Sequence, residues 1–123
     1  MSACICDYEI PEFHNVKQVK RARKRHRCGE CGAFILPGTP YEYVSGKWDG
    51  DLNWHRTCPL CKELREWATI SVPCFCWAYG NLHDDVNDMV DATRHKVPGF
   101  YFEYGRRMIR IKRARKASRE SAP

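Results

Sequence analysis

Two cysteine pairs, Cys28-x2-Cys31 and Cys58-x2-Cys61, constrain this chain more than any other feature of its sequence. Cysteines separated by two residues can point both sulfurs at one ion from a tight turn. Two such pairs supply the four thiolates that tetrahedral Zn²⁺ favours. Gly29 and Gly32 allow the first turn to be tight. The spacing predicts a structural Zn²⁺ site with the ligands Cys28, Cys31, Cys58 and Cys61.

The segments around these pairs predict a small α+β fold. A strand is expected at 41–44 and a return strand at 52–55, with an Asp-Gly turn between them. A helix capped by Thr57 is expected to end before Pro73. A cysteine knuckle, a β-hairpin and a helix that carries the last two ligands follow the order of a treble-clef zinc finger. The zinc would stabilise a chain of only 123 residues.

The rest of the chain predicts an amphipathic helix over 82–96, because its apolar residues form one stripe and its acidic residues lie near its start. A strand is expected at 100–104, followed by a basic tail that is disordered at its end. The expected organisation has four parts: an N-terminal arm with a basic block (1–27), a zinc-binding domain (28–72), a helix plus a strand that pack on it (73–104), and a basic tail (105–123).

Other metal ligands remain open at this point. The stretch Trp54-His55-Arg56-Thr57-Cys58-Pro59-Leu60-Cys61 resembles the WHxxCxxC stretch of LIM-type zinc fingers, which implies the ligand set Cys28, Cys31, His55 and Cys58. However, Leu64 stands where a LIM second site would have its next cysteine, and four cysteines are favoured. A possible second metal site comprises Cys4, Cys6, Cys74 and Cys76, with His83 as a substitute ligand; these four cysteines could also be plain thiols.

The net charge of +6 is unevenly distributed. Residues 1–27 contain seven basic and three acidic residues, residues 28–104 contain six and eleven, and residues 105–123 contain eight and one. Basic arms on an acidic body suit a nucleic-acid partner, DNA or RNA, or they could lie against that body. The residues expected to contact nucleic acid are Arg21, Arg23, Lys24, Arg25, Arg27, Arg110, Lys112, Arg113, Arg115 and Lys116. The rings offered for base stacking are Trp48, Trp77, Tyr101, Phe102 and Tyr104.

The sequence does not predict an enzyme. Four thiolates leave no open coordination position for water, and the chain has no H-x-E, P-loop or G-x-S-x-G motif. No apolar stretch approaches the roughly 20 residues of a membrane span. The N-terminus also lacks the apolar run of a secretory signal, so a cytoplasmic protein with neither a membrane nor a small-molecule partner is expected. A protein-binding module is the rival function, with the acidic helix as its contact surface.

The stretch RKRHRCGECGAFILPGTPYEYVSGKWDG and the later TCPLC resemble a family of small proteins encoded in phages and prophages of proteobacteria. The resemblance spans Arg21 to about Gly80. It implies a zinc-finger-like domain and an infected bacterial host cell, without a defined activity. It also gives the rival function a concrete form, since a small phage protein of this kind could bind a host protein complex as an inhibitor or an adaptor.

Overall fold

The computed structural model describes residues 13–48, 50–72, 75–93 and 98–121. These residues form an α+β fold with two antiparallel sheets and three helices, which confirms the predicted class. The elements are β1 (Phe13–Val19), β2 (His26–Arg27), β3 (Phe34–Ile35), β4 (Tyr41–Trp48), β5 (Asp51–Thr57), α1 (Pro59–Ser71), α2 (Leu82–Thr93) and α3 (Phe100–Ser121).

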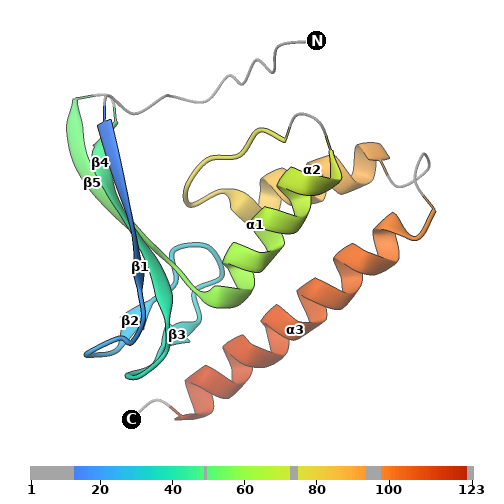
Figure 1. The fold of residues 1–123 in the computed structure, drawn as a ribbon. Coiled ribbons are helices and arrows are strands. Elements are labelled where there is room, and N and C mark those ends of the chain that lie inside the picture. Colours follow the sequence, from blue (N-terminus) through green and yellow to red (C-terminus); the bar gives the residue numbers. More distant parts are fainter. Residues whose placement is uncertain (1–12, 49, 73–74, 94–97, 122–123) are drawn as a thin grey trace.

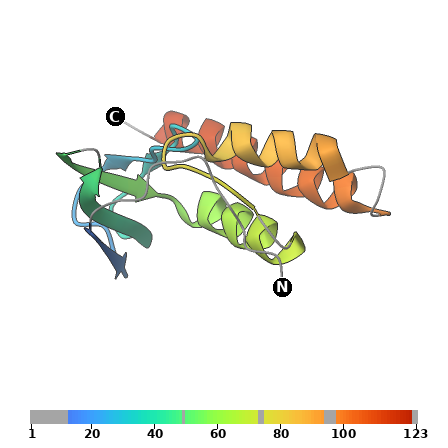
Figure 2. The same ribbon diagram turned by 90° about the horizontal axis from the view of Figure 1, so that it is seen from above.

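The larger sheet has the strand order β1-β4-β5, and the helices lie on one side of it (Figures 1 and 2). Along β4, buried and half-buried residues alternate, and Glu42, Val44 and Gly46 are the buried ones. The β4–β5 hairpin is the one predicted, although both strands are longer than expected. β1 was not predicted; it lies in the expected N-terminal arm and pairs along its whole length with β4.

Helix α1 begins directly after β5 and leads the chain from the sheet into the helical layer. Its N-cap is Cys58, so the predicted cap at Thr57 is wrong. Pro59 occupies the first turn, where its missing N–H costs nothing. The helix ends at Ser71, before Pro73 as predicted.

The hydrophobic core lies where the helices meet the cysteine pairs. Leu64 and Ala68 of α1 are fully buried, as are Leu82, Val86 and Val90 of α2. The apolar stripe predicted for α2 is therefore confirmed. The described part of this helix ends at Thr93, and the predicted extension over 94–96 lies outside the described residues.

The strand expected at 100–104 is wrong, because residues 100–121 form one helix, α3. The basic tail is thus helical as far as Ser121, and its last residues, 122–123, lie outside the described residues. The positions that are buried, Phe100, Ile111 and Ser118, decide the structure. Their separations of eleven and seven residues are close to whole helical turns, whereas on a strand they would alternate between faces. The boundary expected at 104/105 falls inside this helix.

The basic block at 17–27 is not helical. It comprises the end of β1, a bent segment and β2. Among the described residues, no helix has the length and apolar composition needed to cross a membrane.

Candidate metal centre and the basic surface beside it

The first cysteine pair lies in the turn between β2 and β3. The backbone closes the turn with hydrogen bonds from Cys28 N to Ala33 O (2.8 Å) and from Gly32 N to Cys28 O (3.0 Å). Gly32 has φ +77°, a conformation that glycine adopts readily. Two backbone N–H groups donate hydrogen bonds to the sulfurs. Glu30 N lies 3.4 Å from Cys28 Sγ, and Ala33 N lies 3.4 Å from Cys31 Sγ. This turn, residues 28–33, is called the knuckle below.

The second pair lies at the start of α1 and faces the knuckle. Cys58 N donates to Cys28 Sγ (3.4 Å), and Gly29 N donates to Arg56 O (2.8 Å), which ties the knuckle to the end of β5. Cys61 lies in the first turn of α1 and is fully buried. The N-terminus of a helix favours thiolates because its backbone dipoles present positive charge there.

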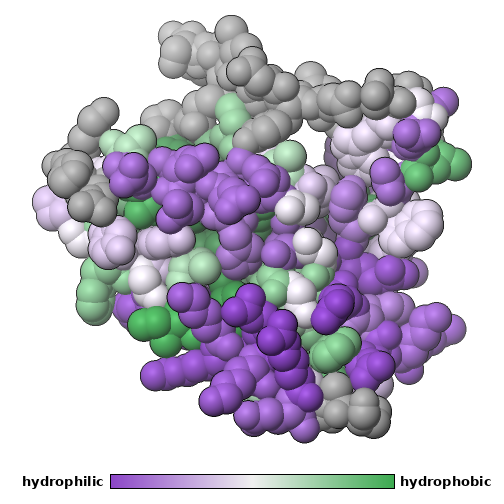
Figure 3. Space-filling model, turned by 180° about the vertical axis from the view of Figure 1, so that it is seen from behind, coloured by the Kyte–Doolittle hydropathy of each residue, from purple (hydrophilic) through white to green (hydrophobic). Residues whose placement is uncertain are grey.

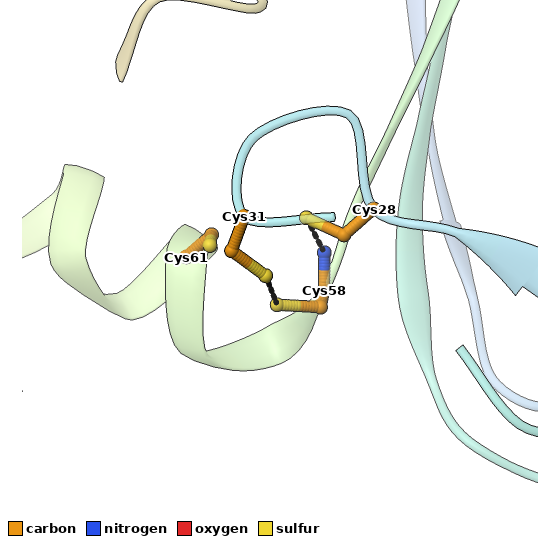
Figure 4. A group of neighbouring side chains, drawn as sticks. All are labelled: Cys28, Cys31, Cys58 and Cys61. Atoms are coloured by element: carbon orange, nitrogen blue, oxygen red, sulfur yellow. Dashed lines mark hydrogen bonds between the residues drawn. The ribbon is translucent and has the colours of Figure 1, made fainter. Parts of the chain in front are cut away.

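The four cysteines converge in Figure 4, and their sulfurs all lie within 4.8 Å of one another. Cys31 Sγ and Cys58 Sγ are 3.8 Å apart. Four sulfurs at the usual Zn–S distance of about 2.3 Å in a tetrahedron would be about 3.8 Å from each other. All four thiols are free of disulfides. The cluster therefore has the donors and the size to hold a tetrahedral metal ion.

The electrostatics of the cluster also suit a cation. Hydrogen bonds from the neighbouring thiols, first that of Cys31, lower the pKa of Cys28 and so favour its thiolate form. The bond to that Cys28 thiolate, together with burial, raises the pKa of both Cys58 and Cys61. Four thiols this close together cannot all ionise without a cation, because the thiolates would repel one another. A divalent ion at their centre would stabilise every thiolate.

The two histidines weighed as ligands have different positions. His55 stacks on Tyr79 with ring centres 4.8 Å apart and meets the edge of Trp48 at 5.2 Å. The structure thus assembles the four-cysteine set and not the LIM-like set that includes His55. His83 Nε2 lies 3.3 Å from Cys61 Sγ, beside the first cluster, although the sequence suggested it for a second one.

The possible second metal site, Cys4, Cys6, Cys74 and Cys76, can be compared with the structure at Cys76 alone. Cys4, Cys6 and Cys74 lie outside the described residues. Cys76 is disulfide-bonded, and a sulfur in a disulfide is not a thiolate ligand. Among the described residues, the four-cysteine cluster is the one group that could hold a metal.

Glu30 links the knuckle to α2, and the sequence analysis missed it. Its carboxylate accepts hydrogen bonds from Gly80 N (3.1 Å) and Leu82 N (3.2 Å) at the start of α2. Burial raises the pKa of this carboxyl, and these two bonds partly oppose the rise. A residue within a C-x2-C turn that caps a helix 50 residues later leaves no local signal in the sequence.

We expect Glu30→Ala to lower the free energy of unfolding by about 1–2 kcal/mol, because it removes the cap of α2. Urea denaturation of the metal-loaded protein measures this change. Glu66→Ala is the matched control, since Glu66 is exposed and forms a surface ion pair with Lys62 at 3.8 Å. Equal effects of the two variants would show that Glu30 does not hold α2.

The two basic segments meet at the knuckle. Arg27 Nε donates to Gly32 O (3.2 Å), and Arg115 Nη1 of α3 approaches Cys31 O at 3.5 Å. Phe34 N donates to Ser118 Oγ (3.1 Å), so α3 is also bonded to β3. In Figure 3 the most hydrophilic side chains gather in the lower part of the molecule, where β2, β3 and the C-terminal half of α3 lie.

Nearly all the residues predicted to contact nucleic acid are exposed. Arg115 is half-buried against the knuckle, and Arg110 forms an ion pair with Glu63 of α1 at 3.1 Å. Arg25 and Arg27 are exposed directly before the knuckle, and the C-terminal half of α3, which is bonded to the knuckle through Arg115, exposes Lys112, Arg113, Lys116 and Arg119. Of these the prediction omitted Arg119. Arg21, Arg23 and Lys24 are exposed on the segment between β1 and β2. We call these nine residues the basic surface.

The rings expected to stack on bases divide into two groups. Trp48 and Trp77 pack edge-on against Tyr79 and are half-buried. Tyr101 and Phe102 are exposed and Tyr104 is half-buried near the start of α3, at the other end of the helix from the knuckle. The predicted rings therefore do not lie on the basic surface.

Comparison of the chain with protein-family models, curated proteins and solved structures finds no match. The four-cysteine cluster and the basic surface are thus the features from which a function can be inferred.

Proposed function

We propose that this chain is a non-enzymatic zinc-binding protein that contacts nucleic acid through its basic surface. The observation that carries the proposal is that two basic segments, more than 80 residues apart in sequence, are bonded to the same cysteine turn. A metal site that fixes both segments would present one preformed array of cations.

Zinc is the metal proposed for the cluster. Four thiolates at tetrahedral spacing are the ligand set of structural Zn²⁺ sites, and they leave no position for a reacting water. The knuckle, the β4–β5 hairpin and α1 follow the treble-clef order. The metal would contribute folding free energy and would hold Arg27 and Arg115 in place.

Phosphates are the ligands that such a surface would recognise. Neither segment, Lys17 to Arg27 or Arg106 to Arg119, contains an acidic residue of its own. In the second segment Arg106, Arg107 and Arg110 pair with Glu103 or Glu63, and the nine residues of the basic surface are not among these pairs. Each cation that pairs with a phosphate releases counterions, so the affinity should fall steeply with salt. We place this function in the cytoplasm of a bacterium that carries the phage, a setting supported by the family resemblance of residues 21–80.

The first test measures binding of the zinc-loaded protein to labelled oligonucleotides by fluorescence anisotropy at several salt concentrations. We expect the triple variant Arg23→Gln, Lys24→Gln, Arg25→Gln to bind roughly tenfold or more weakly. Its slope of log K against log salt should be smaller by about one for each phosphate contact that is lost. Absence of salt-dependent binding by the wild-type protein would refute the proposal.

A matched pair of single variants locates the contact along α3. Lys116→Gln and Arg106→Gln remove the same charge from exposed positions of one helix, and only Lys116 lies near the knuckle. We expect a weaker affinity for Lys116→Gln and little change for Arg106→Gln. If the two variants lose affinity equally, net charge and not the basic surface governs binding. A host protein retained by the chain after nuclease treatment would favour the inhibitor or adaptor function instead.

A further inference from the structure

The side of the larger sheet that faces away from the helices carries an unusual set of side chains. Because residues paired across strands share a face, the register places Lys17 and Arg56 on either side of Tyr43. The next outward position of β4, Ser45, is flanked by Asn15 and Trp54. We call this side of the sheet the outer face.

The outer face is open over the described part of the chain. Of its residues, Trp54 is 57% exposed and Leu52 is 70% exposed, which is high for large apolar side chains. The helices meet the opposite face, where Arg65 of α1 binds Glu42. Figures 1 and 2 show the helices on that one side only.

The charge on the outer face is of one sign. The guanidinium of Arg56 lies 5.2 Å from the centre of the Tyr43 ring. Lys17 stands on the other side of Tyr43, and among the described residues no acidic residue stands at the outward positions 15, 17, 19, 41, 43, 45, 47, 52, 54 and 56. The outer face thus combines aromatic rings and basic side chains. Such a combination suits a ligand that has both flat faces and negative charge.

The outer face continues into a hollow formed by the basic block. This hollow has a volume of about 730 Å³, and its lining includes Lys17, Lys20, Arg21 and Arg23. Tyr41 also lines it, with its ring 5.3 Å from that of His26. Lys17 and Tyr41 belong to both the outer face and the hollow, so the two form one continuous surface that leads into the basic surface.

We propose that the outer face is a stacking platform for unpaired bases, and that the nucleic acid bound by this protein is therefore single-stranded. The inference rests on the proposed function and names its substrate class. In a duplex the faces of the bases are stacked on each other and cannot reach Trp54 or Tyr43, whereas a single strand can lay its bases on these rings. Its phosphates would then lie along Lys17 and the hollow. Outward residues of one strand are about 7 Å apart, which leaves room for successive bases.

Competition between oligonucleotides of one sequence tests the strand preference. The zinc-loaded protein is mixed with a fluorescein-labelled 20-mer, and unlabelled single-stranded DNA, single-stranded RNA and the corresponding duplex compete for it. We expect either single strand to compete at least tenfold better than the duplex. Equal or better competition by the duplex would overturn the platform and leave the proposed function standing, whereas no binding of any oligonucleotide would refute both.

Trp54→Ala tests the platform itself. Removing one stacking ring should weaken single-strand binding by roughly tenfold, because a base–aromatic stack contributes on the order of 1–3 kcal/mol. The slope of log K against log salt should stay unchanged, whereas Lys17→Gln should lower that slope by about one. Trp54→Phe should restore most of the affinity.

Phe102→Ala is the matched control, since it removes an aromatic side chain of similar exposure (68%) from α3, remote from the sheet. Both residues are exposed, and circular dichroism should show that both variants remain folded. Single-strand affinity equal to wild type in Trp54→Ala, or equal losses in the two variants, would show that the sheet is not the stacking surface.

Discussion

Removal of the proposed zinc ion is expected to unfold this protein. Structural zinc bound by cysteines contributes about 10–16 kcal/mol, as much as or more than the roughly 5–15 kcal/mol total stability of an ordinary domain. Cys28 and Cys61 belong to the buried core together with Ile35 and Leu64, so an empty cluster leaves crowded thiols at the centre of the molecule. Metal analysis should give one zinc for this cluster, and a chelator should abolish the helical circular dichroism signal.

Single substitutions distinguish the two ligand sets considered from the sequence. Cys61→Ser should lower zinc content and release the metal at a much lower chelator concentration, because one of four thiolates is lost. His55→Gln should retain full zinc content, since His55 packs on Tyr79 away from the sulfurs. Loss of zinc in His55→Gln, with zinc retained in Cys61→Ser, would support the LIM-like set and contradict the four-cysteine cluster.

The cysteine cluster was predictable because its signal is local. A C-x2-C pair encodes its own turn geometry, and two such pairs around a hairpin leave little freedom in how they meet. The β4–β5 hairpin was predictable for the same reason, since strand-forming residues alternate on both sides of an Asp-Gly turn.

The parts that could not be predicted depend on contacts between distant segments. β1 is a polar strand in isolation, and its pairing with β4 is what makes it a strand. The apolar residues of α3 are too sparse for a clear helical stripe. The helix is held in place by two of its own side chains: Ser118 accepts a hydrogen bond from β3, and Arg115 donates one to the knuckle. Glu30 belongs to this group as well, because its bonds to α2 arise only after the chain has folded.

A buried ion pair between the sheet and α1 provides the second large prediction. Arg65 donates two hydrogen bonds of 2.7 Å to the Glu42 carboxylate, whose side chain is only 3% exposed. Gln18 donates a third (3.2 Å), and the Arg65 guanidinium lies 5.0 Å from the Trp77 ring centre. Arg65→Met leaves the carboxylate buried without its partner, and we expect the free energy of unfolding to fall by about 3–5 kcal/mol.

The same chemistry at the surface provides the control for this loss. Arg110 and Glu63 form an ion pair at 3.1 Å, but their side chains are 56% and 43% exposed. Arg110→Met should therefore cost less than about 1 kcal/mol. Equal costs for Arg65→Met and Arg110→Met in urea denaturation would contradict a structural role for the buried pair.

The pH dependence of stability should change sign in Arg65→Met. Burial by itself would raise the pKa of Glu42, but the hydrogen bonds and charge of Arg65 outweigh it and hold that pKa below its unfolded value of about 4.3. In the wild-type protein the contribution of the pair is thus fully present above that pH and is lost as the pH falls through the folded pKa. Without Arg65, burial dominates and raises the folded-state pKa of Glu42 above its unfolded value. The Glu42 carboxyl should then destabilise the protein less as the pH is lowered toward that raised pKa.

The double variant Glu42→Gln, Arg65→Met separates this effect from the protonation of the cysteine cluster. It contains the same cysteine cluster as Arg65→Met but no carboxyl group at position 42. The difference in unfolding free energy between the two variants therefore reports Glu42 alone, because any weakening of zinc binding at low pH is common to both. We expect the double variant to be the more stable at pH 7 and its advantage to shrink as the pH is lowered toward 5. An advantage that stays constant over this range would mean that the Glu42 carboxylate is solvated when Arg65 is absent, and that the pair is not buried in solution.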